Sequence, residues 1–101
     1  MTRHIVMWKL PESVSAETKK NTLKTMKDKL LSMQGKIEVL KSIEVSLNLE
    51  EVNASNYDII LETEFESQKD IATYLSHPVH QEVAVYIKSL DLQRAAIDFT
   101  L

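Results

Sequence analysis

The sequence of 101 residues contains no cysteine and only one glycine, and both shortages exclude classes of protein. Without cysteine there is no disulfide framework, no thiolate nucleophile and no cysteine-ligated zinc site. A single glycine excludes the glycine-rich loops that bind phosphate groups. The apolar runs are much shorter than the ~20 residues that a bilayer-spanning helix needs. Disulfide-rich, zinc-finger and phosphate-loop proteins are therefore excluded, and no membrane span is expected.

The charge balance shows no strong excess of either sign, with a net charge of −3 and a pI near 5.6. Binding to nucleic acid or to an anionic membrane is therefore not expected. The first residues, MTRHIVMWKLPES, reach polar side chains too early for a signal peptide, so we expect a cytoplasmic protein. The length predicts a single domain over residues 1–101, with a modest core that a partner chain could supplement.

In the first third of the chain, the apolar pattern predicts a strand followed by a helix. Residues 4–10 are rich in β-branched and aromatic side chains on both parities, which is typical of a central strand covered on both faces. Residues 16–34 have apolar side chains at helical spacing. Ser15 is the expected N-cap of this helix, and Gly35 is expected at its C-cap.

The middle of the chain alternates with a period of two. Residues 37–49 predict a long strand with one buried face, interrupted near Lys41. After a polar loop, the segment YDIILETEF predicts a third strand, in which Ile59, Leu61 and Phe65 alternate with acidic residues.

The last third predicts two helices and a strand. Ser67 and Asp70 resemble a capping box for a short helix, which Pro78 ends, and the same proline suits the first turn of the next helix. The segment LQRAAIDFTL then alternates as a fourth strand. The order βαββααβ predicts an α+β fold of the ferredoxin-like type, with a four-stranded antiparallel sheet and the helices on one face.

A sheet covered by helices on one face leaves its other face open. Val6, Trp8, Ile60 and Ala96 are candidates for this open face. An apolar open face on a small domain indicates an interface or a ligand site. Homodimerisation through the sheet is therefore expected.

The stretch YLSHPVHQ holds the candidate chemistry. His80 lies in the first turn of the last helix, where the partial positive charge of the helix end favours the neutral imidazole. A bend at His77 and Pro78 brings Tyr74 toward His80, and such a pair can move a proton beside a carbonyl. The alternative is structural: His77 caps the helix, Tyr74 packs in the core and His80 is exposed. His4 either faces a pocket or is satisfied at the strand end, and no spacing predicts a metal site.

Together, HIVMWKL, YDIILETEFES, YLSHPVHQEV and the final IDF resemble the stress-responsive α/β-barrel family over nearly the whole chain. The resemblance implies a homodimer in which two sheets close into an α/β barrel. The two-sided apolar strands and the junction of Tyr74 and His80 lead us to expect a small-molecule cleft between sheet and helices in each subunit, and no cofactor is expected. A plant member is a polyketide cyclase, and its roles would fall on His80 as general base and Tyr74 as hydrogen-bond donor. That cyclase has a further pocket histidine where this chain has Ile59.

The same resemblance implies a substrate-binding role for His4, and Trp8 and His77 are expected to contribute to it. Three classes of function stay open. The first is cofactor-independent proton transfer by a cyclase or isomerase acting on a small, partly apolar ligand. The second is quinol or haem oxidation, as in related dimeric barrels. The third is a non-catalytic binding or structural domain associated with stress.

Overall fold

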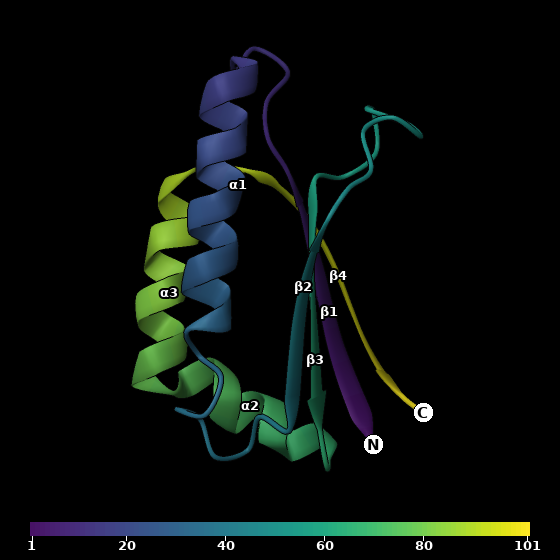
Figure 1. The fold of residues 1–101 in the computed structure, drawn as a ribbon. Coiled ribbons are helices and arrows are strands. Elements are labelled where there is room, and N and C mark those ends of the chain that lie inside the picture. The colour runs from purple at the N-terminus through teal and green to yellow at the C-terminus, as the bar shows by residue number, and fades with distance from the viewer.

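The computed structural model describes all residues 1–101 and has the predicted element order βαββααβ (Figure 1). The elements are β1 (Thr2–Lys9), α1 (Ala16–Leu31), β2 (Ser42–Leu47), β3 (Ile59–Phe65), α2 (Gln68–Ser76), α3 (Pro78–Ser89) and β4 (Gln93–Thr100). None of the three helices combines the length and hydrophobicity that crossing a bilayer requires.

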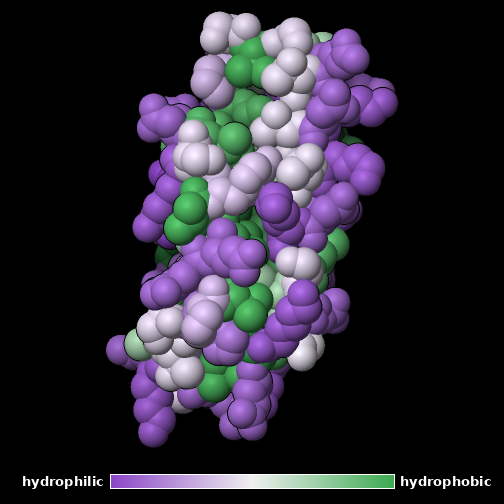
Figure 2. All heavy atoms as spheres, turned by 90° about the vertical axis from the view of Figure 1, so that its left-hand side faces the viewer, coloured by the Kyte–Doolittle hydropathy of each residue, from purple (hydrophilic) through white to green (hydrophobic).

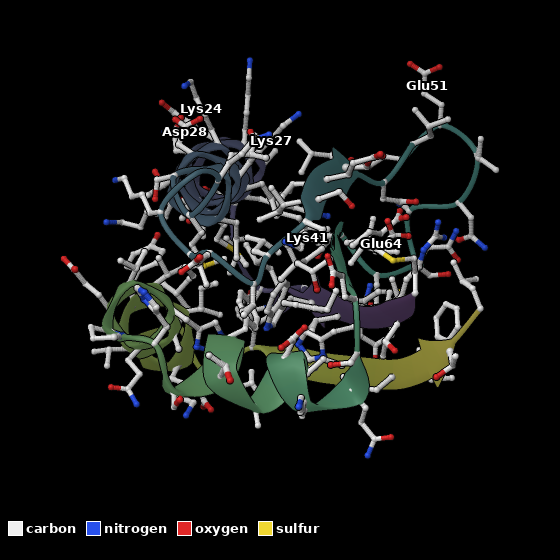
Figure 3. The ribbon with its side chains drawn as sticks, turned by 90° about the horizontal axis from the view of Figure 1, so that it is seen from below. Lys24, Lys27, Asp28, Lys41, Glu51 and Glu64 are labelled. Atoms are coloured by element: carbon white, nitrogen blue, oxygen red, sulfur yellow. The ribbon has the colours of Figure 1, made fainter.

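The four strands form one antiparallel sheet in the order β2-β3-β1-β4, which is the ferredoxin-like arrangement that the sequence predicts. β1 is an inner strand, as expected from its apolar residues on both parities. All three helices lie on the same side of the sheet (Figure 1). The outer surface of this helix layer carries hydrophilic side chains along both flanks with hydrophobic ones between them (Figure 2), and Lys24 and Lys27 of α1 point outward from the molecule (Figure 3).

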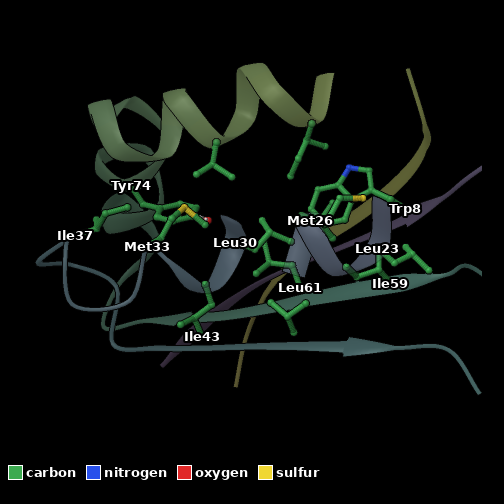
Figure 4. Packing of buried hydrophobic residues seen from close by; sticks show 14 of the residues in the cluster. Trp8, Leu23, Met26, Leu30, Met33, Ile37, Ile43, Ile59, Leu61 and Tyr74 are labelled. Atoms are coloured by element: carbon green, nitrogen blue, oxygen red, sulfur yellow. Dashed lines mark hydrogen bonds between the residues drawn. The ribbon is translucent and has the colours of Figure 1, made fainter. Parts of the chain in front are cut away.

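The hydrophobic core lies between the sheet and the helix layer. In β1 the even-numbered residues are buried, and in β3 the odd-numbered ones are, because successive side chains of a strand point to opposite faces. The helices contribute Leu23, Met26 and Leu30 from α1 and Ile71 and Tyr74 from α2. Within this cluster, Trp8 and Tyr74 lie near opposite ends (Figure 4).

The open face of the sheet differs from the predicted one. Val6 and Trp8 are buried in the core, and Ala96 pairs with Val6 and so lies on the same side, whereas Ile60 is on the open face as expected. The prediction was wrong for three of these four residues because parity alone does not say which face the helices cover. The apolar residues of the open face are Ile5, Met7, Ile60, Ala95, Ile97 and Phe99.

Two predicted segments are shorter than expected. α1 ends at Leu31 with Ser32 as its C-cap, and Gly35 has its positive φ of 78° in the turns that follow rather than at the helix end. Residues 37–41 are not a strand, because the backbone turns there and Leu40 donates to the carbonyl of Ile37. Their alternating apolar side chains pack on the core from this turn.

The predicted helix caps have mixed outcomes. The Ser15 side chain accepts a hydrogen bond from the Thr18 amide, and the prediction that it caps α1 is confirmed. Ser67 stands at the N-cap of α2 without a side-chain hydrogen bond, so the capping box with Asp70 is wrong. His77 Nδ1 accepts from the Val79 amide at 3.1 Å, which confirms that it caps α3.

Asp58 ties α1 to two strands. This residue is buried, with one carboxylate oxygen accepting from the Leu10 amide at 2.8 Å and the other 2.9 Å from Lys19 Nζ. Its amide donates to the Trp8 carbonyl at 2.9 Å. The hydrogen bond to Asp58 raises the pKa of Lys19, with a smaller contribution from Glu50. The end of β1 is therefore held against the start of β3 and the first turns of α1.

Replacing Asp58 by asparagine is expected to destabilise the fold by roughly 2 kcal/mol. Asparagine can still accept from Leu10, but the amide leaves Lys19 without its buried counterion. Urea denaturation measures the change. Asp28→Asn is the matched control, because Asp28 pairs with Lys24 on the exposed face of α1, where such a pair contributes about 0.5 kcal/mol. Equal effects of the two substitutions would contradict the assigned role of Asp58.

Candidate functional site

A cavity of about 390 Å³ lies between the sheet and the helices. This volume is within the range of small-molecule pockets. Most of its lining is hydrophobic, and the polar exceptions are few. Four of the five site residues predicted from the sequence line it, namely His4, Trp8, Tyr74 and His80. The fold thus brings the N-terminal strand and the junction between α2 and α3 to one space.

His77 is the predicted site residue that the fold leaves out. It does not line the cavity, and its Nδ1 accepts the hydrogen bond from Val79 that begins α3. Its backbone is extended, with φ −67° and ψ 136°, as the residue before a proline prefers. His77 therefore bends the chain so that α2 and α3 present Tyr74 and His80 to the same cavity.

Tyr74 is fully buried at one end of the cavity. Its ring lies 5.1 Å from that of Phe65, and its hydroxyl has only the sulfur of Met33 as a partner, at 3.9 Å. Burial raises the pKa of the Tyr74 phenol, so the hydroxyl stays protonated at neutral pH. A buried hydroxyl with so weak a partner is free to donate to a ligand.

The imidazole of His80 lies beside Tyr74, with 4.5 Å between the ring centroids. Its Nδ1 is 3.1 Å from the Leu75 carbonyl oxygen. Because a carbonyl only accepts, Nδ1 carries the proton, and Nε2 of the neutral ring keeps its lone pair. Burial lowers the pKa of His80, and the basic side chains of His4 and Lys88 act in the same direction against the hydrogen bond to Leu75. His80 is thus a neutral base at physiological pH.

His4 is held between its two neighbouring strands. Its Nδ1 lies 2.5 Å from Asp98 Oδ1 on β4, and its carbonyl accepts from the Thr63 hydroxyl on β3 at 2.7 Å. The carboxylate accepts from Nδ1–H, so Nε2 is the nitrogen left for other partners. The ring of His4 is 6.1 Å from that of Tyr74.

Sequence reasoning missed three polar residues of this region. Asp98 orients His4, while Lys88 of α3 and Arg94 of β4 line the cavity itself. Lys88 could have been found from the helical spacing, since it lies eight residues after His80 on the same face. Asp98 and Arg94 follow only from the register of β4 against β1.

Residues 2–101 match the model of a family described as the stress responsive A/B barrel domain. No curated protein matches the chain.

Among solved structures, a dimeric ferredoxin-like protein of unknown function from Bacteroides fragilis is 28% identical, with a TM-score of 0.85, and the match covers 99% of this chain and 95% of that one. A dimeric ferredoxin-like protein of unknown function from Thermobifida fusca is 25% identical, with a TM-score of 0.76 and coverage of 99% and 90%. A hydroxynitrile lyase from Passiflora edulis is 16% identical, with a TM-score of 0.71 and coverage of 99% and 92%, which shows the same fold.

The environment of His80 predicts an unusual titration. We expect the His80 ring to titrate with a midpoint below the ordinary value of 6.5, because burial disfavours the imidazolium. Proton NMR of the histidine ring signals across pH measures it, with His80→Gln identifying the signal. Because the pKa of His80 is lower in the folded state than in the unfolded state, the free energy of unfolding decreases as the pH falls from 6.5 toward the folded-state pKa. A midpoint at or above 6.5 would contradict the neutral-base geometry.

Proposed function

The chain belongs to the stress-responsive α/β-barrel domain family, and we propose that its cavity binds a small, partly apolar carbonyl compound and catalyses proton transfer on it without a cofactor. The observation that carries this proposal is the pairing of His80 and Tyr74 in one hydrophobic cavity. The imidazole is oriented by the Leu75 carbonyl, and the hydroxyl beside it lacks a strong partner.

The proposed reaction begins with the free lone pair of His80. Nε2 takes a proton from the carbon next to the substrate carbonyl, and the C–H electron pair moves to form the enolate. The Tyr74 hydroxyl donates a hydrogen bond to the carbonyl oxygen as negative charge develops there. The imidazolium then returns the proton to carbon or to oxygen. Both groups end in their starting states, as catalysis requires.

The other lining residues would position the substrate. His4, held by Asp98, offers Nε2 as a second polar contact near the tyrosine, and Trp8 with the aliphatic side chains covers the apolar part of the ligand. A hydroxynitrile lyase has the same fold, which is compatible with lyase chemistry on this scaffold. If His80 and Tyr74 only bind, the cavity serves instead as a non-catalytic ligand site.

Removing either proposed catalytic group is expected to slow proton exchange. Tyr74→Phe and His80→Ala should each reduce the rate by about 10²-fold or more, the usual contribution of a positioned acid or base. The measurement is hydrogen–deuterium exchange by NMR at the carbon next to the carbonyl, over a panel of enolisable ketones and β-keto esters.

Stability separates this effect from misfolding. Tyr74→Phe should leave the melting temperature unchanged or raise it, because the buried hydroxyl has only a long contact to sulfur. Tyr86→Phe is the matched control, since the Tyr86 ring lies under Lys29 outside the cavity. Unchanged exchange in both Tyr74→Phe and His80→Ala would remove the assigned roles.

We further propose that two copies of the chain pair through the open sheet face. Ile97 and Phe99 of β4 are exposed there, at 60% and 37%, and Ile5 and Met7 of β1 adjoin them. Such a patch on an isolated chain favours an interface. The neighbours from Bacteroides fragilis and Thermobifida fusca are described as dimeric, which supports the same assembly here.

A charge placed in this face is expected to break the dimer. Ile97→Glu should give a monomer at micromolar concentration, because a carboxylate would be buried without a counterion. Val85→Glu is the control: Val85 is 69% exposed on α3, in the helix layer on the other side of the sheet, and should leave the dimer intact. Light scattering measures the mass. A monomeric unmodified protein would contradict the proposed assembly.

A further inference from the structure

Two cationic residues, Lys88 and Arg94, also line the cavity. We propose that these two side chains bind an anionic group of the ligand, a carboxylate or a phosphate monoester, at the end opposite Tyr74 and His80. This inference rests on the proposed function only in taking the same cavity as the ligand site. It assigns the ligand a polarity and a length that proton transfer alone does not require.

α3 places its contribution along one stripe. His80, Val83, Ala84, Ile87 and Lys88 all line the cavity, and they follow the spacing of a single helix face. His80 and Lys88 are eight residues apart, which is roughly 12 Å along a helix axis. Aliphatic side chains occupy the interval between them.

Along the sheet, the pair of His4 and Asp98 and the pair of Trp8 and Arg94 are separated by about the same distance as His80 and Lys88 along α3. His4 pairs with Asp98 and Trp8 pairs with Arg94, so both pairs lie on the side of the sheet that faces the helices. The four residue steps from His4 to Trp8 span roughly 13 Å of strand. Along both the helix and the sheet, the cavity therefore extends from an acid-base end, defined by Tyr74 and His80, to a cationic end, defined by Lys88 and Arg94.

Neither Lys88 nor Arg94 has an ion-pair partner within the chain. Some basic residues elsewhere meet carboxylates, as Arg3 does with Glu64, Lys19 with Asp58 and Lys41 with Glu66, whereas exposed lysines such as Lys20 and Lys36 form no ion pair and do not line the cavity. No ion pair or side-chain hydrogen bond involves Lys88 or Arg94. Lys88 also lies in the last turn of α3, where a positive charge is favourable, but this does not explain Arg94, which lies on a strand.

The chemistry selects an elongated amphipathic anion. A guanidinium can hold a carboxylate or a phosphate through two parallel hydrogen bonds, and the lysine ammonium adds a second charge. Both residues are exposed and line the cavity, so an anionic group can stay partly solvated while its apolar part enters between Trp8 and Ile87. A neutral ligand would leave both cations without a counterion.

Trp8 supplies the readout. It is the only tryptophan of the chain, it lines the cavity, and it is the direct cross-strand partner of Arg94. Titrating the full-length protein with octanoate, octyl phosphate and octanol should change its fluorescence saturably with the two anions. Octanol should bind more weakly than either anion. Whichever anion binds more tightly identifies the head group.

The double variant Lys88→Gln with Arg94→Gln should weaken binding of the anions by roughly tenfold while leaving octanol unchanged, because two partly exposed ion pairs are lost. The control is Lys24→Gln with Lys27→Gln, which removes the same charge from the outer face of α1 (Figure 3) and should leave all affinities unchanged. Equal anion affinities in the double variant and the unmodified protein would overturn the proposal. So would octanol binding as tightly as octanoate, or no saturable binding of either anion.

The same protein preparations separate this inference from the proposed reaction. If Tyr74→Phe abolishes proton exchange while octanoate binding persists, both proposals are supported. If exchange is unaffected by Tyr74→Phe and His80→Ala but anion binding needs Lys88 and Arg94, the proton-transfer proposal fails and the anion site stands.

Discussion

The register of β1 between β3 and β4 determines the positions of the residues around the cavity. This register pairs His4 with Thr63 and Asp98, and Trp8 with Ile59 and Arg94. A slip of one residue would turn His4 and Trp8 to the open face, because side chains alternate across a strand. The hydrogen bonds from His4 to Asp98 and from Thr63 to the His4 carbonyl depend on this pairing. The acid-base end and the cationic end therefore have a common origin in the strand pairing.

The packed core surrounds two polar groups, the Tyr74 hydroxyl and the His80 imidazole, that remain able to bind a ligand. Asp58 accepts a hydrogen bond from the Leu10 amide, forms an ion pair with Lys19 and secures the Trp8 end of the sheet. The Tyr74 hydroxyl, by contrast, is buried against a thioether, and burial disfavours the charged form of His80. A fold selected for stability alone would pair or remove such groups. Their presence in one hydrophobic cavity is the main physical reason for assigning it a ligand and a reaction.

The two faces of the sheet differ in what covers them. One face forms the core and the cavity, with Val6 and Leu61 between its polar ends. The other carries exposed apolar side chains such as Ile97, together with glutamates of β2 and β3. Pairing of two copies through that face would stiffen the sheet without covering the helix side. The residues that line the cavity all come from one chain, and the proposed dimer would act on it by holding β1 and β4 in place.

Local sequence determined much of this protein. The element order, the Ser15 cap and the bend at His77 and Pro78 all follow from neighbouring residues, and so does the proximity of Tyr74 to His80, because caps and prolines act within a few positions. Local pattern misread residues 37–41, where alternating apolar side chains pack from a turn. Only the tertiary structure decided which sheet face the helices cover, and it alone brought Asp98 to His4 and Arg94 to the cavity. His4 and Asp98 are 94 residues apart, and strand register is set by packing between distant segments.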